Sequence, residues 1–260
     1  MLSIHVIRLT LLAAAVLAAS TAFAQVKTDG QWRGAGGAAL SMTSGNSSTS
    51  ALALNGDMAR ATIEDKITLG ANTNYGRSKN AAGISSTTAN KWSAAGEYDY
   101  NLSPAVFVFG KLGLEGDGVI DLSLRTTLAA GLGYKLIDTK ELSFNVFGGV
   151  GYSTDKYSAT QNIGGVKGTS FSRSSLFLGE ESQHQLSAST TFKQRLELYP
   201  GLSGDKAKII KFTAGLGVAM SSTLNLSVGL TDNYNSLPAA GNKKNDLGLF
   251  TGINVKFGAP

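Results

Sequence analysis

Length, composition and charge already exclude several classes of protein. The chain has 260 residues, of which 42% are hydrophobic and only 16% are charged, with 32 glycines and no cysteine. Without cysteine, the chain can form neither a disulfide nor a thiolate metal site. The formal net charge is +5, but the basic residues are scattered singly rather than clustered, so nucleic acid is not an expected partner.

The first 24 residues have the form of a secretory signal peptide. Arg8 precedes an apolar run from Leu9 to Ala19, and Ala22-Phe23-Ala24 supplies the small residues of a cleavage site. The run is too short to be a membrane anchor, and no later stretch reaches the ~18 apolar residues of a spanning helix. We therefore expect a signal peptide at residues 1–24 and one exported β domain at residues 25–260.

From Trp32 to Phe257 the chain alternates apolar and polar residues in long segments separated by turn residues. A period of two places apolar side chains on one face of a strand and polar side chains on the other. The segments exceed the usual five or six residues of a soluble strand and reach the ~10 residues that a tilted strand needs to cross a bilayer. In chain order, the predicted strands are residues 31–44, 48–60, 65–77, 89–102, 105–116, 121–137, 141–155, 170–181, 184–199, 207–220, 223–235 and 245–257.

The predicted connections alternate in length, as they do in outer-membrane barrels with short periplasmic turns and long extracellular loops. Those after even-numbered strands are short, such as residues 101–104, 137–140 and 221–222. Most of those after odd-numbered strands are longer, at residues 77–88, 155–169, 200–206 and 236–244, and residues 44–47 are a short exception.

Aromatic residues lie near the ends of the predicted strands, while Leu, Val, Ile, Ala and Gly fill the middle of the same face. Trp and Tyr prefer membrane–water interfaces, so this distribution predicts two girdles around a lipid-facing band. The periplasmic girdle would contain Trp32, Tyr98, Tyr100, Tyr134, Phe144 and Phe257, and the extracellular girdle Tyr75, Trp92, Tyr152, Phe212 and Tyr234.

The opposite face carries charges of both signs among Ser, Thr, Asn and Gly, and in a barrel it would face the lumen. There the charges either pair with one another or line a water-filled channel, and because neither sign dominates we expect weak ion selectivity or a closed lumen. The predicted lumen-facing charged residues are Lys91, Glu97, Asp99, Lys111, Glu115, Asp121, Arg125, Lys193, Arg195, Glu197 and Lys211.

Little in the sequence points to catalysis, a metal or a cofactor. After residue 24 the only histidine is His184, which we expect in a solvated periplasmic turn around residues 180–183. An outer-membrane phospholipase would need a Ser–His–Asn arrangement with the serine two residues from the histidine. The nearest downstream serine, Ser187, is three residues away and faces the opposite side. We therefore expect no enzymatic activity.

Several segments resemble the salt-induced outer-membrane proteins, also called YdiY-like, a family otherwise described as a domain of unknown function. The resemblance spans nearly all of residues 25–260 and implies an outer-membrane β-barrel with no established activity. It rests on residues 40–46 (LSMTSGN), 87–92 (TTANKW), 97–103 (EYDYNLS), 130–138 (AGLGYKLID), 230–234 (LTDNY) and 241–244 (GNKK). One departure is the tail Gly258-Ala259-Pro260 after Phe257, because barrel proteins usually end on the aromatic that assembly machinery recognises.

The sequence thus predicts an all-β, antiparallel transmembrane β-barrel of about 12 strands in a Gram-negative outer membrane, acting as an envelope protein or narrow pore. Expected partners are outer-membrane lipid and lipopolysaccharide, the barrel-assembly machinery during biogenesis, and ions or small solutes. Two alternatives stay open: a soluble periplasmic lipocalin-like binding barrel with its apolar face inwards, and an outer-membrane hydrolase.

Overall fold

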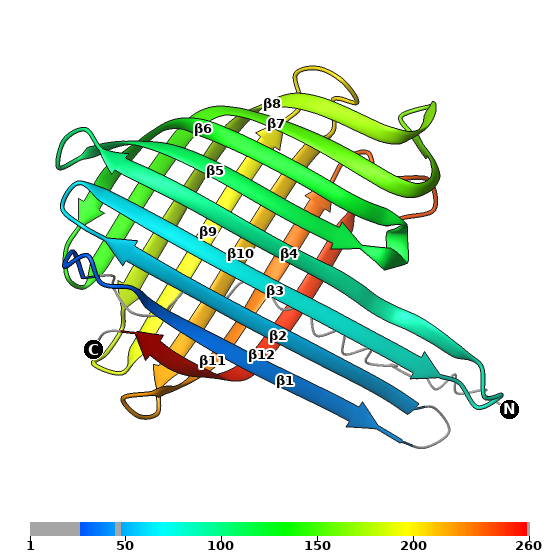
Figure 1. Ribbon diagram of the computed structural model, residues 1–260, viewed down its shortest axis with the longest axis horizontal. Coiled ribbons are helices and arrows are strands. Elements are labelled where there is room, and N and C mark those ends of the chain that lie inside the picture. Colours follow the sequence, from blue (N-terminus) through cyan, green and yellow to red (C-terminus); the bar gives the residue numbers. More distant parts are fainter. Residues whose placement is uncertain (1–26, 45–47, 259–260) are drawn as a thin grey trace, which may run out of the picture.

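Twelve antiparallel strands close into a barrel in the computed structural model, which describes residues 27–44 and 48–258 (Figure 1). The predicted signal peptide and the end of the tail, Ala259-Pro260, lie outside the described residues. The strands are β1 Arg33–Thr43, β2 Ser48–Ala61, β3 Asp65–Lys79, β4 Ser85–Asn101, β5 Val106–Asp117, β6 Leu122–Asp138, β7 Leu142–Ile163, β8 Val166–Gln185, β9 Thr190–Pro200, β10 Lys208–Ala219, β11 Leu224–Asn235 and β12 Asn245–Gly258.

Each strand pairs with its neighbours in the chain, and β1 pairs with β12 to close the wall. A short 3-10 helix, η1 (Gly118–Ile120), joins β5 to β6. Within residues 27–44 and 48–258, no helix is both long and apolar enough to cross a membrane. The even number of strands in this up-and-down order returns the described chain to the end of the barrel where it began.

The period of two survives folding along almost every strand and separates two chemically different faces. On β6, for example, Leu128 and Leu132 lie exposed on the outside, whereas Ala129 between them is buried on the inside. The outward Leu and Val side chains remain exposed because no protein layer covers them, which is the arrangement of a barrel whose outer wall meets lipid. A lipocalin-like barrel needs the reverse arrangement, with its apolar face around an internal ligand, so the fold does not match that alternative.

Ten of the eleven predicted aromatic residues have the parity of the outer face on their strands, and Trp32, which precedes β1, is exposed. Tyr98 and Tyr100 on β4 and Tyr134 on β6 are exposed near one end of the barrel, and Tyr75 and Tyr152 near the other. This separation leaves an aliphatic band between two aromatic girdles, as in transmembrane barrels.

All twelve predicted strands are present, but the prediction was wrong at β7, β8 and β9. Residues 156–169 were predicted to be a loop; instead β7 and β8 continue beyond their neighbours and turn at Gly164-Gly165, which have φ of 58° and 87°. A two-residue turn with positive φ suits a twisted hairpin and favours glycine. Tyr157 and Ile163 of this segment are buried, but the residues between them are mostly polar, so the pattern of a lipid-facing strand is absent.

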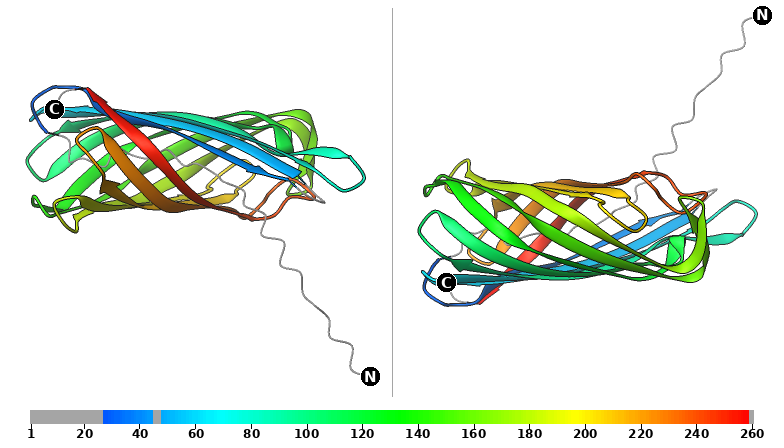
Figure 2. Two further views of the ribbon diagram at one scale, coloured as in Figure 1. Left: turned by 90° about the horizontal axis from the view of Figure 1, so that it is seen from below. Right: turned by 90° about the horizontal axis from the view of Figure 1, so that it is seen from above.

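The β8–β9 turn also lies further along the chain than predicted. β8 continues to Gln185 and the turn is at residues 186–189, so His184 lies within a strand and not in a turn. The β3–β4 connection is likewise shorter than predicted, at residues 80–84, because both strands extend past the barrel as a hairpin (Figure 2). Part of the loop asymmetry expected from the sequence therefore takes the form of longer strands.

Candidate functional site: the charged lumen

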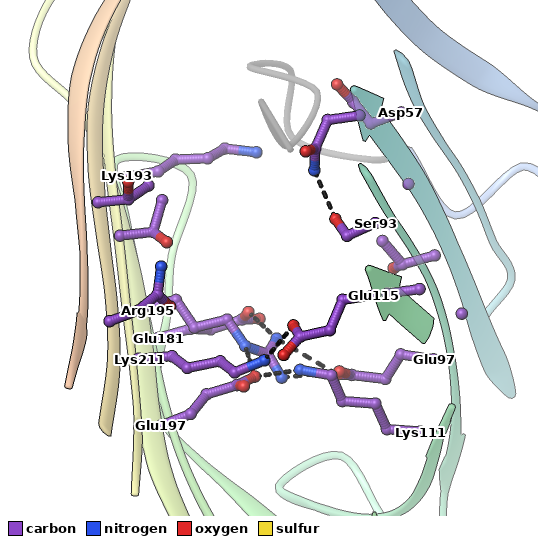
Figure 3. Close-up of a pocket in the computed structure, with 18 of the residues that line it drawn as sticks. Asp57, Ser93, Glu97, Lys111, Glu115, Glu181, Lys193, Arg195, Glu197 and Lys211 are labelled. Atoms are coloured by element: carbon purple, nitrogen blue, oxygen red, sulfur yellow. Dashed lines mark hydrogen bonds and ion pairs between the residues drawn. The ribbon is translucent and has the colours of Figure 1, made fainter. Parts of the chain in front are cut away.

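Strand parity places ten of the eleven predicted charged residues on the inner face. Ion pairs among the luminal charges form a network across the lumen, and Figure 3 shows the part of it around Arg195. Asp121 is different. It follows η1 with φ of 59° and accepts hydrogen bonds from Ser158 and Gln161 at the end of the barrel. The left-handed turn that ends η1 leaves Asp121 exposed, away from the luminal charges.

Arg195 is at the centre of this network. Its guanidinium nitrogens lie 2.7 Å from carboxylate oxygens of Glu97, Glu181 and Glu197. Arg195 is on β9 and Glu97 is on β4, five strands away around the barrel, so this ion pair crosses the lumen from wall to wall. The guanidinium also lies 4.8 Å from the centre of the Phe147 ring.

Besides Arg195, three lysines connect opposite walls. Lys111 on β5 binds Glu197 on β9, whose second oxygen accepts a hydrogen bond from Tyr199 at 3.0 Å. Lys211 on β10 lies 2.9 Å from Glu115 on β5. Lys66 on β3 lies 3.7 Å from Glu181 on β8 and 3.4 Å from Asp99 on β4. These contacts obstruct the lumen with charged side chains that neutralise one another.

A second group of ion pairs follows the wall towards the predicted extracellular end. Arg125 contacts Glu115 at 2.7 Å and Asp155 at 2.6 Å, and Asp155 also accepts from Arg173 at 3.1 Å. Arg173 in turn contacts Asp205 at 2.7 Å. Arg173, Asp155 and Asp205 are almost fully buried, so this chain of charges fastens the β9–β10 connection to β8.

Lys91 connects three strands close to the same end of the lumen. Its ammonium group lies 3.3 Å from Asp117 on β5 and also binds Asp246 on β12. β4 and β12 are four strands apart around the barrel, so this contact again spans the interior.

Aromatic residues fill one side of the lumen, and this cluster was not predicted from the sequence. Phe109, Phe147, Phe177 and Tyr199 pack with ring centres 4.8 to 5.9 Å apart. Phe177 is fully buried. The cluster narrows the lumen beside β5 to β9 and leaves the polar path along the other walls.

A cavity of about 920 Å³ occupies the remaining lumen. Figure 3 shows Lys193 extending into it from one wall, opposite Asp57 and Ser93, with the ion-pair network at one end. Asn72 donates a hydrogen bond to Ser93 at 2.7 Å on that facing wall. Within residues 27–44 and 48–258, no three His, Cys, Asp or Glu side chains are grouped so as to hold a metal ion.

Seven members of these ion pairs were not among the predicted residues: Lys66, Asp117, Asp155, Arg173, Glu181, Asp205 and Asp246. Asp205 lies in the β9–β10 connection, but the other six have the parity of the inner face on their strands, so the same period of two identifies them once the strands have correct bounds. Asp155 and Glu181 lay at the ends of predicted strands that in fact continue, and this is why they were overlooked.

His184, which lies on β8, contacts two neighbouring side chains. Its Nε2 lies 3.2 Å from Ser182 Oγ, two residues earlier on the same face of β8, and its ring packs 5.9 Å from that of Phe192. Ser182 thus has the two-residue spacing from His184 that Ser187 lacks. Of the described side chains, only Ser182 is hydrogen-bonded to the His184 imidazole, so no third group orients the ring.

The chain is similar to the NanC porin (12% identity, 86% of this chain and 97% of that one, TM-score 0.44). It is also similar to the COG4313 outer membrane channel from Pseudomonas putida F1 (11%, 91% and 97%, 0.45) and to the KdgM porin (11%, 88% and 98%, 0.39). No curated protein sequence matches the chain. The model of a protein family of unknown function, DUF481, matches residues 36–257. This match covers most of the chain, so the protein belongs to the DUF481 family.

Proposed function

We propose that this protein is a non-enzymatic β-barrel of the bacterial outer membrane that forms a narrow, weakly selective path for ions and small solutes. Ion pairs across the lumen hold the path nearly closed. The observation that carries this proposal is the bridge from Arg195 on β9 to Glu97 on the facing strand β4. Lipopolysaccharide, the barrel-assembly machinery and a role in envelope stress belong to the same proposal.

Membrane insertion is supported by the uncovered outer wall. Its Leu and Val side chains form an aliphatic band between aromatic residues, and burying such a surface in lipid removes apolar area from water. A simple test is the migration of unboiled and boiled protein in detergent gels. A membrane barrel resists unfolding until heated and changes its mobility, whereas equal mobility in both samples would contradict the proposal.

Narrow conduction is supported by the balance of charge at the obstruction. Fixed charge of one sign selects the opposite ion, and the luminal ion pairs present both signs within a few ångströms of each other. Water and small ions can cross the barrel only along the part of the luminal cavity that runs beside the ion pairs.

Planar-bilayer conductance of the refolded protein tests the proposal directly. Wild type should give small currents with weak selectivity. The Glu97→Gln/Arg195→Gln variant removes one acid and one base from the central bridge, so its conductance should rise several-fold and become cation-preferring, because Glu181 and Glu197 lose Arg195. A large, strongly anion-selective wild-type current would contradict the proposal.

The matched control is Asp29→Asn/Arg33→Gln, which also removes one acid and one base. This pair contacts at 2.7 Å near the periplasmic end, outside the luminal network. The hydrogen bond that Asp29 accepts from Arg33 holds the pKa of the Asp29 carboxyl well below its usual range, so the pair is charged at neutral pH. The control should conduct like wild type, and an increase equal to that of the luminal variant would show that the central bridge is not the obstruction.

The hydrolase alternative has its own test. His184→Ala should leave folding and conductance unchanged, and wild type should not hydrolyse phospholipid or ester substrates. Hydrolysis by wild type that is lost in both His184→Ala and Ser182→Ala would replace the proposed channel with an enzyme that uses the pair on β8.

A further inference from the structure

The wall of the barrel is incompletely paired where its first and last strands meet. β1 pairs with β12 over six residues only, from Arg33 opposite Gly258 to Ala38 opposite Ile253. β1 pairs with β2 over eleven residues, and β12 pairs with β11 over eleven. The edge of β1 from residue 39 to 43 and the edge of β12 from residue 245 to 252 therefore face each other without ladder pairs, and Figure 1 shows the two strands diverging there.

The unpaired part of this seam falls within the depth of the bilayer core. Six residues at ~3.3 Å each, on strands tilted by about 40°, rise roughly 15 Å, whereas the apolar band of a barrel is ~25 Å tall. Pairing thus stops about 10 Å short of the outer edge of the band, at the depth of the outer leaflet. Open sheet edges facing hydrocarbon leave backbone polar groups unsatisfied, so such an edge is tolerated only beside water or a polar occupant.

Side chains beside the unpaired edges are more exposed than their counterparts elsewhere on the wall. Leu40 and Met42 on β1 are 69% and 74% exposed, and Leu249 on β12 is 67% exposed. Outward leucines on fully paired strands are less exposed, for example Leu128 at 51% and Leu112 at 43%. A missing neighbouring strand produces this higher exposure, and the exposed side chains form an apolar rim on the outside of the seam.

The luminal side of the seam is apolar at the point where pairing ends. Phe250 on β12 is buried against Ala53 and Ala39, and its ring covers Gly229 on β11. Below this ring, towards the periplasmic end, the seam is fastened by polar groups. Asn55 donates to Asn254 at 3.2 Å, and Asn254 donates to Ser227 at 2.7 Å.

This polar chain passes over β1 at Gly37, where a Cβ would collide with the side-chain oxygens of Asn55 and Asn254. The seam is therefore locked in its lower half by side chains as well as by backbone pairing. Its upper half has Phe250 and small residues behind it, and the Lys91–Asp246 ion pair near the extracellular end. The seam thus has a lower part that is held across β1 and an upper part that can admit a ligand.

Exposed basic residues lie around the extracellular end of the same seam. Lys243 and Lys244 directly precede β12, and Arg77 on β3 faces outwards in register with Ser50 and Met42. The neighbouring acid, Asp246, is bound to Lys91. An apolar rim beneath exposed cations complements an amphiphile that has an alkyl chain and an anionic head group.

We propose that the upper half of the β1–β12 seam is a lateral opening that binds a phosphorylated lipid of the outer leaflet. Its alkyl chain lies between Leu40, Met42 and Leu249, outside Phe250, and its phosphate contacts Lys243 and Lys244. Water and the polar part of the ligand satisfy the unpaired backbone groups. The proposal rests on the membrane placement proposed above but not on conduction.

Because the chain has no cysteine, cysteines introduced at this seam are the only thiols that a spin label can modify. Met42→Cys/Leu249→Cys places two labels that would be directly opposite if the register of Ala38 and Ile253 continued. Leu128→Cys/Tyr152→Cys is the matched control, an outward pair that is directly opposite on the fully paired strands β6 and β7. Both variants are refolded into phosphatidylcholine vesicles, and flotation with the vesicles verifies insertion.

Dipolar broadening of continuous-wave spectra, which covers the short separation of directly opposite residues, together with double electron–electron resonance for longer separations, should give a longer and broader distance distribution for the seam pair than for the control pair. Adding dodecyl phosphate should narrow the seam distribution and leave the control unchanged, whereas zwitterionic dodecylphosphocholine should have little effect. Lys243→Gln/Lys244→Gln should remove the response to dodecyl phosphate. Lys140→Gln/Lys167→Gln, which removes two exposed lysines elsewhere, should retain it.

Three results would overturn the proposal. Equal distributions for the two pairs in floated vesicles would mean that the seam is closed. An open seam that ignores dodecyl phosphate, or responds equally without Lys243 and Lys244, would exclude an anionic lipid at this place. Intermolecular distances from singly labelled Met42→Cys would assign the edges to a second copy of the chain. Protein that fails to float would instead contradict the proposed membrane placement.

Discussion

At the scale of single residues, glycines on the inner wall make room for rings on the neighbouring strand. Phe107 lies over Gly133, Phe147 over Gly179 and Phe250 over Gly229, and in each case a Cβ on the glycine would collide with the ring. Each aromatic ring covers the backbone that its glycine leaves bare, so pairs of this kind stabilise sheets and pin their register.

Gly133→Ala should therefore destabilise the barrel by about 1–3 kcal/mol, the usual range for overpacking, because the new Cβ overlaps the Phe107 ring. Urea unfolding in vesicles measures the difference. Gly110→Ala on β5 is the control, since a Cβ there meets no atom within 4 Å, and its unfolding midpoint should match wild type. Equal midpoints for the two variants would contradict the packing argument.

Outward leucines report on the surrounding lipid. Leu128 and Val228 lie in the middle of their strands and are half exposed on the outer face. Replacing either with Arg should cost about 2–4 kcal/mol, as expected for a cation at the midplane of a barrel's lipid face. Replacement with Ala should be tolerated. Vesicle unfolding that is as stable for Leu128→Arg as for wild type would mean that this face does not meet lipid.

At the scale of elements, the β7–β8 hairpin depends on packing at its base and on glycine at its tip. Tyr157 and Phe171 pack edge to face with ring centres 6.0 Å apart, and both belong to a buried cluster with Leu122 and Ile163. The β11–β12 connection adds a backbone hydrogen bond of 3.2 Å from Ala240 to Asn162. The hairpin is therefore held over the end of the barrel rather than standing free.

Gly165→Val should fray the tip of this hairpin and leave the barrel intact, because a β-branched residue is strongly disfavoured at the φ of 87° found there. Trypsin cleavage after Lys167 measures the effect and should become faster. Gly168→Val is the control, since its φ is not positive and its Cβ would meet its nearest neighbour at an ordinary 3.7 Å. Equal cleavage rates for the two variants would show that the turn geometry does not limit local opening.

At the scale of the whole molecule, ion pairs act as cross-links between strands that are four or five apart in the closed order. They resist collapse or ovalisation of the barrel and obstruct the lumen at the same time. Breaking one partner of a buried pair typically costs 3–5 kcal/mol because the other charge is left uncompensated. Stability and closure are therefore coupled in this protein.

Replacing both Arg125 and Arg195 with Gln should shift the conductance towards cations, because Glu97, Glu115 and Glu181 then face the lumen with fewer cations beside them. Reversal potentials in a salt gradient measure the shift. Glu97→Gln/Glu115→Gln removes the same number of charges of opposite sign and should shift the preference towards anions. A shift in the same direction for both variants would mean that these side chains do not line the ion path.

The strands and their two faces could be predicted from the sequence because the period of two is local. Leu128 faces outwards and Arg125 inwards for the same reason that alternate side chains of any strand point to opposite sides. The predicted ends of β7 and β8 were wrong because their hairpin projects beyond the band that lipid would cover. There the apolar pattern that marks a spanning strand is absent.

By itself, the sequence determined the fold class, the number of strands and the side of the wall on which ten of the eleven predicted charges lie, with Asp121 as the exception. Only the tertiary structure decided which charges meet, because Arg195 and Glu97 are brought together by closure of the barrel and not by any spacing along the chain. Closure also decided where β1 and β12 stop pairing. The relative stagger of the first and last strands depends on the twist and tilt of the whole sheet, a global quantity that no local pattern contains.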